Sequence, residues 1–358
     1  MRVVVAMSGG VDSSVAAALL KERGLDVVGV TMRLCEEERE PQGGRGCCGS
    51  RATRDAARVA ATLGIPHYAW DFREEFEAEV VEDFCSEYAR GRTPNPCIRC
   101  NERVKFTALL GRAAELGADV IATGHHARIV RGHNGAWRLR KGADARKDQS
   151  YFLYSITQEQ MARVLMPVGE YTKDQVRGMA RRLGLPVAEK PESQEICFVP
   201  DDDYAGFLRR RRPELLRAGS VLDTSGNVVG VHEGIAGFTV GQRKGLGLAF
   251  GERRYVVRID VSTNSVVLGE KNEARGRVIE AGDVNWISGR PPELPVRTWA
   301  RVRYQSRGGA AAVEPLGEGR ARVVFDEPQW APTPGQAVVF WQDDAVLGGG
   351  TIEQSRPE

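Results

Sequence analysis

Two groups of residues in this 358-residue chain could do chemistry: a glycine turn near the start and a set of cysteines further on. The turn reads Ser-Gly-Gly-Val-Asp-Ser-Ser, from Ser8 to Ser14, and lies between an apolar run, Val3 to Met7, and an Ala/Leu-rich stretch, Val15 to Leu20. This order predicts a strand, a turn and a helix start. Glycines let the backbone approach a ligand, and N–H groups at a helix start bind phosphate oxygens. The turn therefore predicts a phosphate-binding loop.

The spacing in the turn excludes two common nucleotide loops. No Gly-Lys-Ser/Thr follows as in a Walker loop, and the Gly-x-Gly-x-x-Gly dinucleotide pattern is absent. The turn resembles the PP-loop, Ser-Gly-Gly-x-Asp-Ser, of the ATP pyrophosphatases. That resemblance implies activation of a substrate with AMP and release of pyrophosphate.

The cysteines form the second group. Seven cysteines without an export signal indicate reduced thiols for metal or catalytic chemistry. Cys97 and Cys100 form a Cys-x-x-Cys pair that follows Thr-Pro-Asn-Pro, so two prolines stiffen the approach. The pair could be half of a zinc site, a redox dithiol or part of an iron-sulfur ligand set. We prefer Cys197 as its partner, because the adjacent Cys47 and Cys48 have a poor spacing for zinc.

The elements that must position these residues are those of an α/β fold. In the first half, strand-like runs alternate with helical patterns, which predicts a parallel sheet covered by helices on both faces. The expected strands are Val3–Met7, Val27–Met32 and Asp119–Thr123, and the expected helices are Arg51–Leu63, one carrying Phe76, Val80, Phe84 and Tyr88, Val104–Leu116 and Thr172–Leu183. Ligands of such sheets lie beyond the carboxyl ends of the strands, where the turn, Met32 and Gly124 fall.

The second half changes character. Asp201 to Arg217 predicts an arginine-dense helix, and Tyr255 to Leu268 predicts a hairpin. Strand-like runs from Val296 to Ile352 predict a small closed antiparallel barrel. We therefore expect a Rossmann-like α/β PP-loop catalytic domain with a parallel sheet (residues 1–200), a small linking domain (201–275) and a C-terminal antiparallel β-barrel (276–358).

Composition narrows the classes further. Fifty basic residues against 48 acidic ones give a formal charge of +2, so any surface for nucleic acid must be local. No apolar run approaches the roughly 20 residues of a membrane helix, and Val3 to Met7 is too short for a signal-peptide core. We expect a cytoplasmic protein.

Six motifs, taken in their order along the chain, show a closer resemblance to one known family. They are the PP-loop, Thr-Pro-Asn-Pro-Cys-x-x-Cys-Asn, Ala-Thr-Gly-His, Lys-Asp-Gln-Ser-Tyr-Phe, Ser-Gln-Glu-Ile-Cys-Phe and Gly-Gln-Arg-Lys-Gly-Leu-Gly. Together they resemble the bacterial tRNA 2-thiouridylase family over essentially the whole chain. The resemblance implies ATP-dependent 2-thiolation of the wobble uridine, position 34, in tRNAs for Lys, Glu and Gln. It implies two partners, the anticodon arm of tRNA and a sulfur-donor protein of a cysteine desulfurase relay, and neither membrane nor DNA.

The resemblance also implies a site for ATP and Mg²⁺. The residues that would hold the nucleotide are Ala6, Met7, Ser8, Gly9, Gly10, Val11, Asp12, Ser13, Met32 and Gly124. After adenylation of the uridine O2, Cys197 would deliver sulfur as a persulfide, and Cys100 would form a disulfide with Cys197 or release sulfide from it. The residue types fit, because a thiolate or persulfide is a strong nucleophile and an adenylated oxygen is a good leaving group.

Cys97 departs from many family members, which carry an aspartate there that is proposed as a general base. A thiol acts as a base only if its pKa is lowered. Cys97, Cys100 and Cys197 could instead ligate a four-iron cluster that leaves one iron open to sulfide. The persulfide and cluster routes both stay open.

Further positions match those at which members of the family contact tRNA. They are Asn95, Pro96, Cys97, His125, Lys147, Asp148, Gln149, Arg303, Tyr304 and Gln336. The target base must leave the anticodon stack to react, which suits a cleft between domains.

Two rival functions use only part of these features. A PP-loop ligase that adenylates a small molecule would account for the loop, but it would give no function to Cys100, Cys197 or the barrel. A non-catalytic tRNA-binding or sulfur-carrier protein needs no ATP, so it would tolerate Asp12→Asn or Ser13→Ala.

Overall fold

The computed structural model describes residues 1–35, 50–191, 196–199, 203–247 and 251–357. Some sequence predictions fall outside these ranges. They are the charged loop from Glu36 to Gly46, Cys47 and Cys48, Ser193 to Glu195 of the second cysteine motif, and the first residues of the helix predicted from Asp201.

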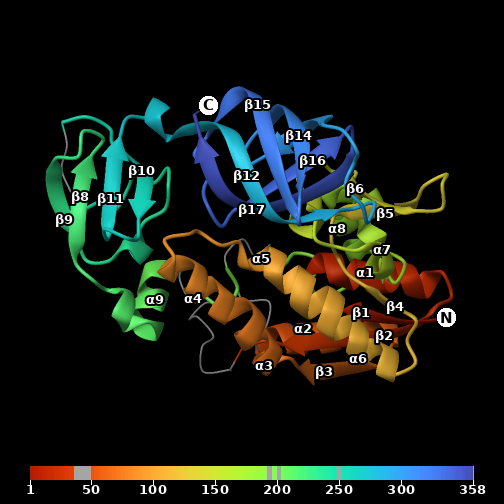
Figure 1. Ribbon diagram of the computed structural model, residues 1–358. Coiled ribbons are helices and arrows are strands. Elements are labelled where there is room, and N and C mark those ends of the chain that lie inside the picture. Colours follow the sequence, from red (N-terminus) through yellow and green to blue (C-terminus); the bar gives the residue numbers. More distant parts are fainter. Residues whose placement is uncertain (36–49, 192–195, 200–202, 248–250, 358) are drawn as a thin grey trace.

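A five-stranded parallel sheet organises the first half of the chain (Figure 1). Its order is β3-β2-β1-β4-β7, with β1 Arg2–Ala6, β2 Asp26–Arg33, β3 His67–Asp71, β4 Val120–Ala122 and β7 Val164–Leu165. The chain builds β1, β2 and β3 outward in one direction and then places β4 on the other side of β1. The order therefore reverses between β1 and β4, which is where open α/β sheets bind ligands.

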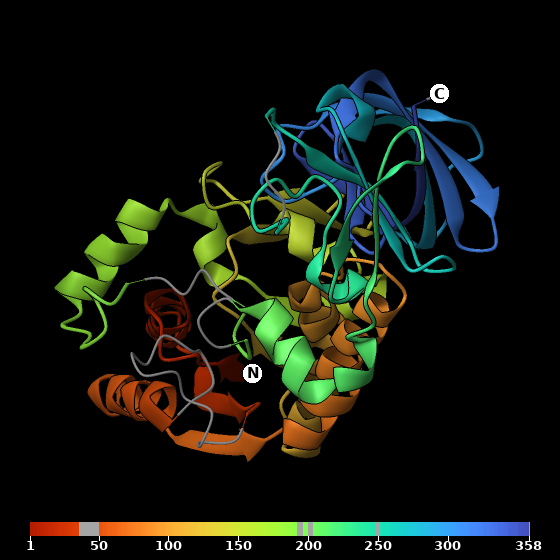
Figure 2. The same cartoon turned by 90° about the vertical axis from the view of Figure 1, so that its left-hand side faces the viewer.

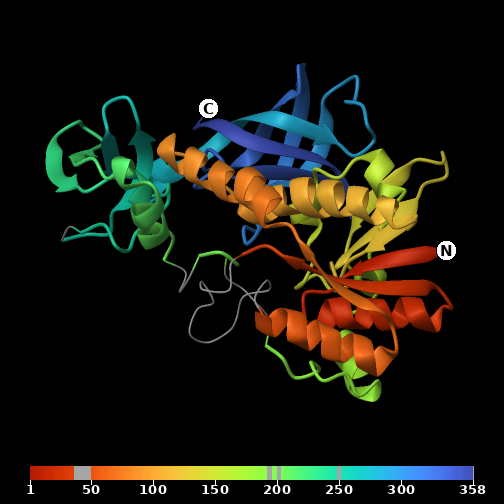
Figure 3. The same cartoon turned by 90° about the horizontal axis from the view of Figure 1, so that it is seen from below.

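Helices cover both faces of this sheet (Figure 3). Successive side chains of β1 alternate between two cores, because side chains along a strand point to opposite faces: Val3 and Val5 pack with α1, α2 and α8, whereas Val4 packs with the helices of residues 73–115. The covering helices are α1 Val11–Glu22, α2 Ser50–Leu63 and α8 Lys173–Arg182 on one face, and α3 Arg73–Phe76, η2 Glu77–Val81, α4 Glu82–Ala89, α5 Pro96–Arg99, η3 Cys100–Ala108 and α6 Leu109–Glu115 on the other. The parallel sheet with helices on both faces is confirmed.

The second half forms two β units. The middle sheet has the order β10-β11-β8-β9, with β8 Gly219–Asp223, β9 Val228–His232, β10 Tyr255–Asp260 and β11 Ser265–Gly269. The six C-terminal strands close into an antiparallel barrel through the β12–β17 pairing; they are β12 Arg275–Trp286, β13 Val296–Arg301, β14 Gly309–Gly317, β15 Arg320–Trp330, β16 Ala337–Gln342 and β17 Ala345–Arg356. The predicted barrel and the β10–β11 hairpin are confirmed, although the barrel begins earlier than Val296. In Figure 2 the side that bears the middle sheet faces the viewer.

The structure corrects two details. The helix predicted from Asp201 to Arg217 is shorter, α9 Tyr204–Arg211, because Pro213 lacks an N–H and disfavours helical backbone in the residue before it. A hairpin, β5 Ala127–Arg131 and β6 Trp137–Lys141, joins the sheet of the barrel at β17 although it lies within the first 200 residues. The α/β unit and the barrel are therefore connected by a shared sheet.

Short helices complete the chain. They are η4 Ser150–Leu153, α7 Gln158–Met161, η5 Pro167–Glu170, η7 Pro213–Leu215, η8 Ile235–Gly237 and η9 Asn272–Ala274. Within the described residues, no helix has the length and apolar character needed to span a membrane.

Candidate nucleotide and thiol site

The predicted phosphate loop lies at the point where the strand order reverses. Residues Met7 to Gly10 connect β1 to α1, a twelve-residue helix that begins at Val11. Met7 is anchored to the neighbouring strand β2, since its N–H donates to Val30 O at 2.8 Å and its carbonyl accepts from Thr31 Oγ1 at 2.8 Å. The first amides of α1 therefore point past the carboxyl ends of β1 and β4, a geometry that suits phosphate oxygens.

Two glycines keep this loop open to a ligand. Gly9 has a φ of +66°, and a Cβ there would lie 2.4 Å from Ala52 O at the start of α2. Gly124 follows β4, and a Cβ there would lie 2.5 Å from Ser13 N and 2.7 Å from the Asp12 carbonyl carbon. Backbone against backbone leaves no room for a side chain at either position. Gly124 thus lies directly beside the start of α1, as its predicted role requires.

Serine hydroxyls hold the turn in shape. Ser14 Oγ donates to Gly10 O at 2.7 Å, and Ser13 Oγ accepts from the Ser8 N–H at 3.2 Å. These are local side-chain to backbone hydrogen bonds of the kind that fix helix starts. Of the other predicted nucleotide residues, Ala6 is the last residue of β1, and Val11 and Met32 are buried.

Asp12 is the charged residue of the loop, and two side chains that donate hydrogen bonds contact its carboxylate. Lys173 Nζ lies 2.7 and 2.6 Å from its two oxygens, and His126 Nε2 lies 3.1 Å from Oδ1. Burial alone would raise the pKa of Asp12, but the hydrogen bond from His126 and the charge and hydrogen bonds of Lys173 outweigh it and hold the pKa below its usual value. Asp12 is therefore an anion in a paired, half-enclosed position.

Lys190 makes a second long-range contact to the loop. Its Nζ donates to Gly9 O at 3.0 Å and to Asp55 Oδ2 at 2.7 Å, so it joins the loop to α2. Sequence reasoning missed His126, Lys173 and Lys190. The one signal near them is Thr172, whose capping box fixes the start of α8 and so places Lys173 in its first turn.

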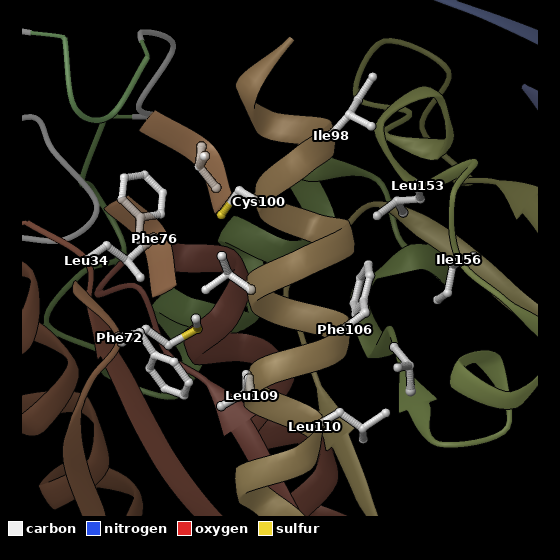
Figure 4. Packing of buried hydrophobic residues seen from close by; sticks show 14 of the residues in the cluster. Leu34, Phe72, Phe76, Ile98, Cys100, Phe106, Leu109, Leu110, Leu153 and Ile156 are labelled. Atoms are coloured by element: carbon white, nitrogen blue, oxygen red, sulfur yellow. The ribbon is translucent and has the colours of Figure 1, made fainter. Parts of the chain in front are cut away.

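The thiol pair lies at the start of a long helical segment formed by α5, η3 and α6 (Figure 4). Pro96 occupies the first turn of α5, where a missing N–H costs nothing. Cys97 is exposed, whereas Cys100 is 8% exposed and its sulfur points from the helix toward the side on which Leu34 and Phe76 lie. The first cysteine therefore faces outward and the second inward.

Cys197 packs against the same hydrophobic core as Cys100. The next residue, Phe198, has edge contacts to Phe76 and Phe84, with ring centroids 5.6 and 5.2 Å apart. This aromatic contact holds the Cys197 segment against the α3–η2–α4 helices. Cys100 thus lies in the same core that Cys197 borders, and Cys35, which follows Leu34, packs against that core as well.

The four-iron alternative needs three ligands that converge. Within the described ranges, which include all three predicted cysteines, no group of three His, Cys, Asp or Glu side chains is arranged to hold a metal ion. One thiol of the set faces outward and another lies in the core. In this conformation the three thiols do not fit a cluster, and we derive no step through one.

His125 connects the nucleotide loop to the thiol helix. It follows Gly124, its Nδ1 lies 2.8 Å from Thr123 Oγ1, and its ring lies 6.0 Å from that of Phe106 on η3. Burial, with a smaller effect of the Lys105 cation, lowers the pKa of His125 well below its usual value, so its ring is neutral at physiological pH. A neutral ring here is a hydrogen-bonding group rather than a charge.

The Lys147-Asp148-Gln149 motif supports the neighbouring backbone through hydrogen bonds. Asp148 is buried, its Oδ1 accepts from the N–H groups of Gly142 and Ser150 at 3.1 Å, and its Oδ2 accepts from Ser150 Oγ at 3.0 Å. Gln149 Oε1 accepts from the His126 N–H at 2.8 Å. These contacts give Asp148 and Gln149 structural tasks, and the predicted tRNA contact of the motif stays a prediction.

The predicted tRNA residues of the barrel also contact protein. Arg303 donates to Val240 O and to Thr333 Oγ1, and burial lowers its pKa. The Tyr304 ring lies 4.4 Å from that of Phe152. Gln336 Nε2 donates to the carbonyls of Thr93 and Pro94, just before Asn95 and the Cys-x-x-Cys helix.

Comparison with known proteins identifies the three parts of this architecture. Family models match the chain in three consecutive segments: the tRNA methyl transferase HUP domain over residues 1–201, the tRNA methyl transferase PRC-barrel domain over 205–270 and the aminomethyltransferase beta-barrel domain over 277–352. The fold, the glycine loop and the match to the first of these domains together define an enzyme with an ATP-using HUP domain.

Full-length relatives specify the family. The tRNA-specific 2-thiouridylase MnmA of Carboxydothermus hydrogenoformans is 52% identical, over 99% of this chain and 98% of that protein. The MnmA proteins of Moorella thermoacetica and Pelotomaculum thermopropionicum are 53% and 54% identical over 98% and 99% of this chain, and over 99% and 98% of their own lengths. This chain belongs to the tRNA-specific 2-thiouridylase MnmA family. The predicted family and enzyme class are confirmed.

Proposed function

We propose that this protein uses ATP to replace O2 of the wobble uridine, position 34, by sulfur in tRNAs for Lys, Glu and Gln. The proposal rests on family membership and on one structural observation. The start of α1, kept open by Gly9 and Gly124, lies one side-chain contact, His125 to Phe106, from the helix that carries Cys100. This contact supports a single site that combines a nucleotide loop and a thiol helix, as adenylation followed by sulfur transfer requires.

The first step is adenylation. The uridine O2 attacks the α-phosphorus of MgATP, the bond to the β-phosphate oxygen breaks, and pyrophosphate leaves. In our proposal the amides of residues 8–13 hold phosphate oxygens, and Asp12 is the residue that would hold the magnesium ion. The step turns a poor leaving group, a carbonyl oxygen, into AMP.

The second step is sulfur transfer. A sulfur-donor protein of a cysteine desulfurase relay loads Cys197 as a persulfide. Its terminal sulfur attacks C2 of the adenylated uridine, and AMP leaves with the oxygen. The Cys100 thiolate then attacks the Cys197 sulfur, so that a Cys100–Cys197 disulfide forms and 2-thiouridine is released; a thiol reductant restores the pair. Alternatively, Cys100 first releases sulfide from the persulfide, and sulfide attacks C2.

The tRNA partner follows from the same proposal. We assign the nucleotide and sulfur chemistry to residues 1–200, a linking role to 201–275 and tRNA contacts to the barrel, 276–358. In our proposal the exposed Cys97 and the neutral His125 contact the flipped base. The anticodon loop is the single-stranded region that such a pocket can accept.

The deciding experiment follows both half-reactions. Unmodified tRNA is incubated with MgATP and a cysteine desulfurase with its cysteine substrate, and the nucleoside at position 34 is analysed by mass spectrometry while pyrophosphate release is recorded. We expect the wild type to thiolate the uridine, and Cys100→Ala and Cys197→Ala to release pyrophosphate without thiolation. Cys85→Ala, which removes a buried thiol of α4 that has no part in the proposed chemistry, serves as the matched thiol control and should thiolate tRNA like the wild type. Pyrophosphate release that ignores tRNA and responds to a small molecule would show a PP-loop ligase instead.

A further inference from the structure

The segment that leads into the Cys-x-x-Cys helix is held by the other two parts of the chain. Thr93 donates its N–H to Pro334 O at 2.8 Å, in the barrel loop before β16. Gln336 Nε2 donates to Thr93 O at 2.9 Å and to Pro94 O at 3.1 Å. The Thr93 hydroxyl lies 3.2 Å from the hydroxyl of Thr239 in the middle unit. In Figure 1, α5 lies directly below the barrel.

Backbone hydrogen bonds anchor the barrel side of this contact. Gly335 N–H donates to Ile352 O at 2.9 Å, and Ile352 N–H donates to Gln336 O at 2.8 Å, so β17 fixes the loop on both sides of Gln336. Tyr151 Oη donates to Ala337 O at 2.8 Å from within the core. Hydrogen bonds from the barrel and from the α/β unit therefore both hold the backbone from which Gln336 projects.

The approach of the two backbones is close enough to exclude a side chain. Gly335 has a φ of +90°, and a Cβ there would lie 2.9 Å from Thr93 N and 3.0 Å from Thr93 O. Arg303 completes the junction, since its guanidinium donates to Val240 O of the middle unit and to Thr333 Oγ1 of the barrel loop. The α/β, middle and barrel units thus meet at the residues just before Asn95.

We propose that Gln336 is a positioning residue for the thiol helix: through the Thr93 and Pro94 carbonyls, the barrel sets the entry of α5 and thereby the placement of Cys97 and Cys100. The proposal rests on the proposed function of these thiols. Two prolines, Pro94 and Pro96, leave the segment little freedom, so a restraint on the Thr93 and Pro94 carbonyls is transmitted to the start of α5. The barrel then acts on the sulfur chemistry as well as on RNA.

The two roles of Gln336 make different predictions. If it positions the helix, removal of its donor group slows thiolation and loosens the helix without changing tRNA affinity. If it touches tRNA, the same change weakens tRNA binding and leaves the helix alone. Gln336→Met keeps the length and apolar stem and removes the amide without adding charge. Gln329→Met is the matched control, because Gln329 Nε2 also donates to a carbonyl, Glu327 O, but within the barrel.

The test measures three quantities on the full chain: the kcat of thiolation, the Kd for unmodified tRNA and the rate at which iodoacetamide labels Cys100, read by peptide mass spectrometry. For Gln336→Met we expect about a tenfold lower kcat, because small misplacements of reacting groups are costly. We expect a tRNA Kd within about twofold of wild type and about tenfold faster labelling of the buried Cys100, since its helix opens more often. Gln329→Met should match wild type.

A second variant approaches the same contact from the backbone. Gly335→Ala should likewise lower kcat and speed Cys100 labelling with little change in the tRNA Kd, because its Cβ would contact Thr93. Unchanged Cys100 labelling in both variants, or a weakened tRNA Kd with unchanged labelling, would overturn the proposal. The labelling result does not depend on the reaction, so failure of the wild type to thiolate tRNA would refute the proposed function and leave the positioning of the helix to be judged on its own.

Discussion

Substituting Gly124 by alanine tests whether the switch point of the sheet is the nucleotide site. The added Cβ would lie 2.5 Å from Ser13 N, whereas ordinary contact begins near 3.4 Å, so one of two backbones must move by about 0.9 Å. Both belong to segments of the proposed site: the turn after β4 and the first turn of α1. A displacement near 1 Å in a site that positions reacting groups costs on the order of 100-fold in rate, about 3 kcal/mol in the barrier.

We therefore expect Gly124→Ala to lower kcat/KM for ATP about 100-fold in tRNA-dependent pyrophosphate release. Gly111→Ala is the matched control, since Gly111 lies within α6 and a Cβ there meets nothing within 4 Å. That variant should keep full activity and gain up to about 1 kcal/mol of stability, because alanine favours helix over glycine. If Gly124→Ala, folded as shown by its circular dichroism, released pyrophosphate within about threefold of wild type, the start of α1 would not be the phosphate site.

Two further outcomes follow from individual side chains. The pKa of Asp12 is held below its usual 3.8 by His126 and Lys173, so its pairing with them stabilises the fold above that pH and is lost as pH falls through the lower value of the folded state. The fall in urea-unfolding free energy below pH 4 should therefore be shallower in Asp12→Asn, and an identical pH profile would contradict the pairing. Burial raises the pKa of Cys85 to about 11, so at pH 8 iodoacetamide should label the exposed Cys97 and spare Cys85 in the folded protein, with equal labelling in urea as the control.

Local patterns predicted the parts of the site that depend on local structure. The strand, glycine turn and helix around Gly9 follow from spacing, since a turn that brings backbone amides to a ligand needs glycine and a helix start. The position of Gly124 followed from the rule that parallel strands end at one edge. The start of α8 after Thr172 followed from its helical pattern, and the structure shows the capping box that fixes it.

Long-range pairings were not predictable, because no local signal records them. Arg211 and Arg212 belong to the arginine-dense helix predicted from the sequence, and in the fold both pair with Glu82 of α4, 129 and 130 positions earlier. The β5–β6 hairpin reads as part of the α/β unit, yet it joins the barrel, where Arg128 and Arg140 both bind Asp344. A charge pattern shows that a partner is needed and does not show which one.

The electrostatics of the phosphate loop depend on residues that lie far from it in the sequence. A carboxylate beside a phosphate site opposes an anion, and here Lys173 neutralises Asp12 while Lys190 reaches Gly9 O and Asp55. Both lysines come from the segment around and after α8, which packs on α1. The loop thus forms from the first strand and helix, but its charge balance is complete only when residues up to 190 have folded around it. The proposed nucleotide site therefore depends on the whole α/β unit rather than on the Ser8–Ser14 turn alone.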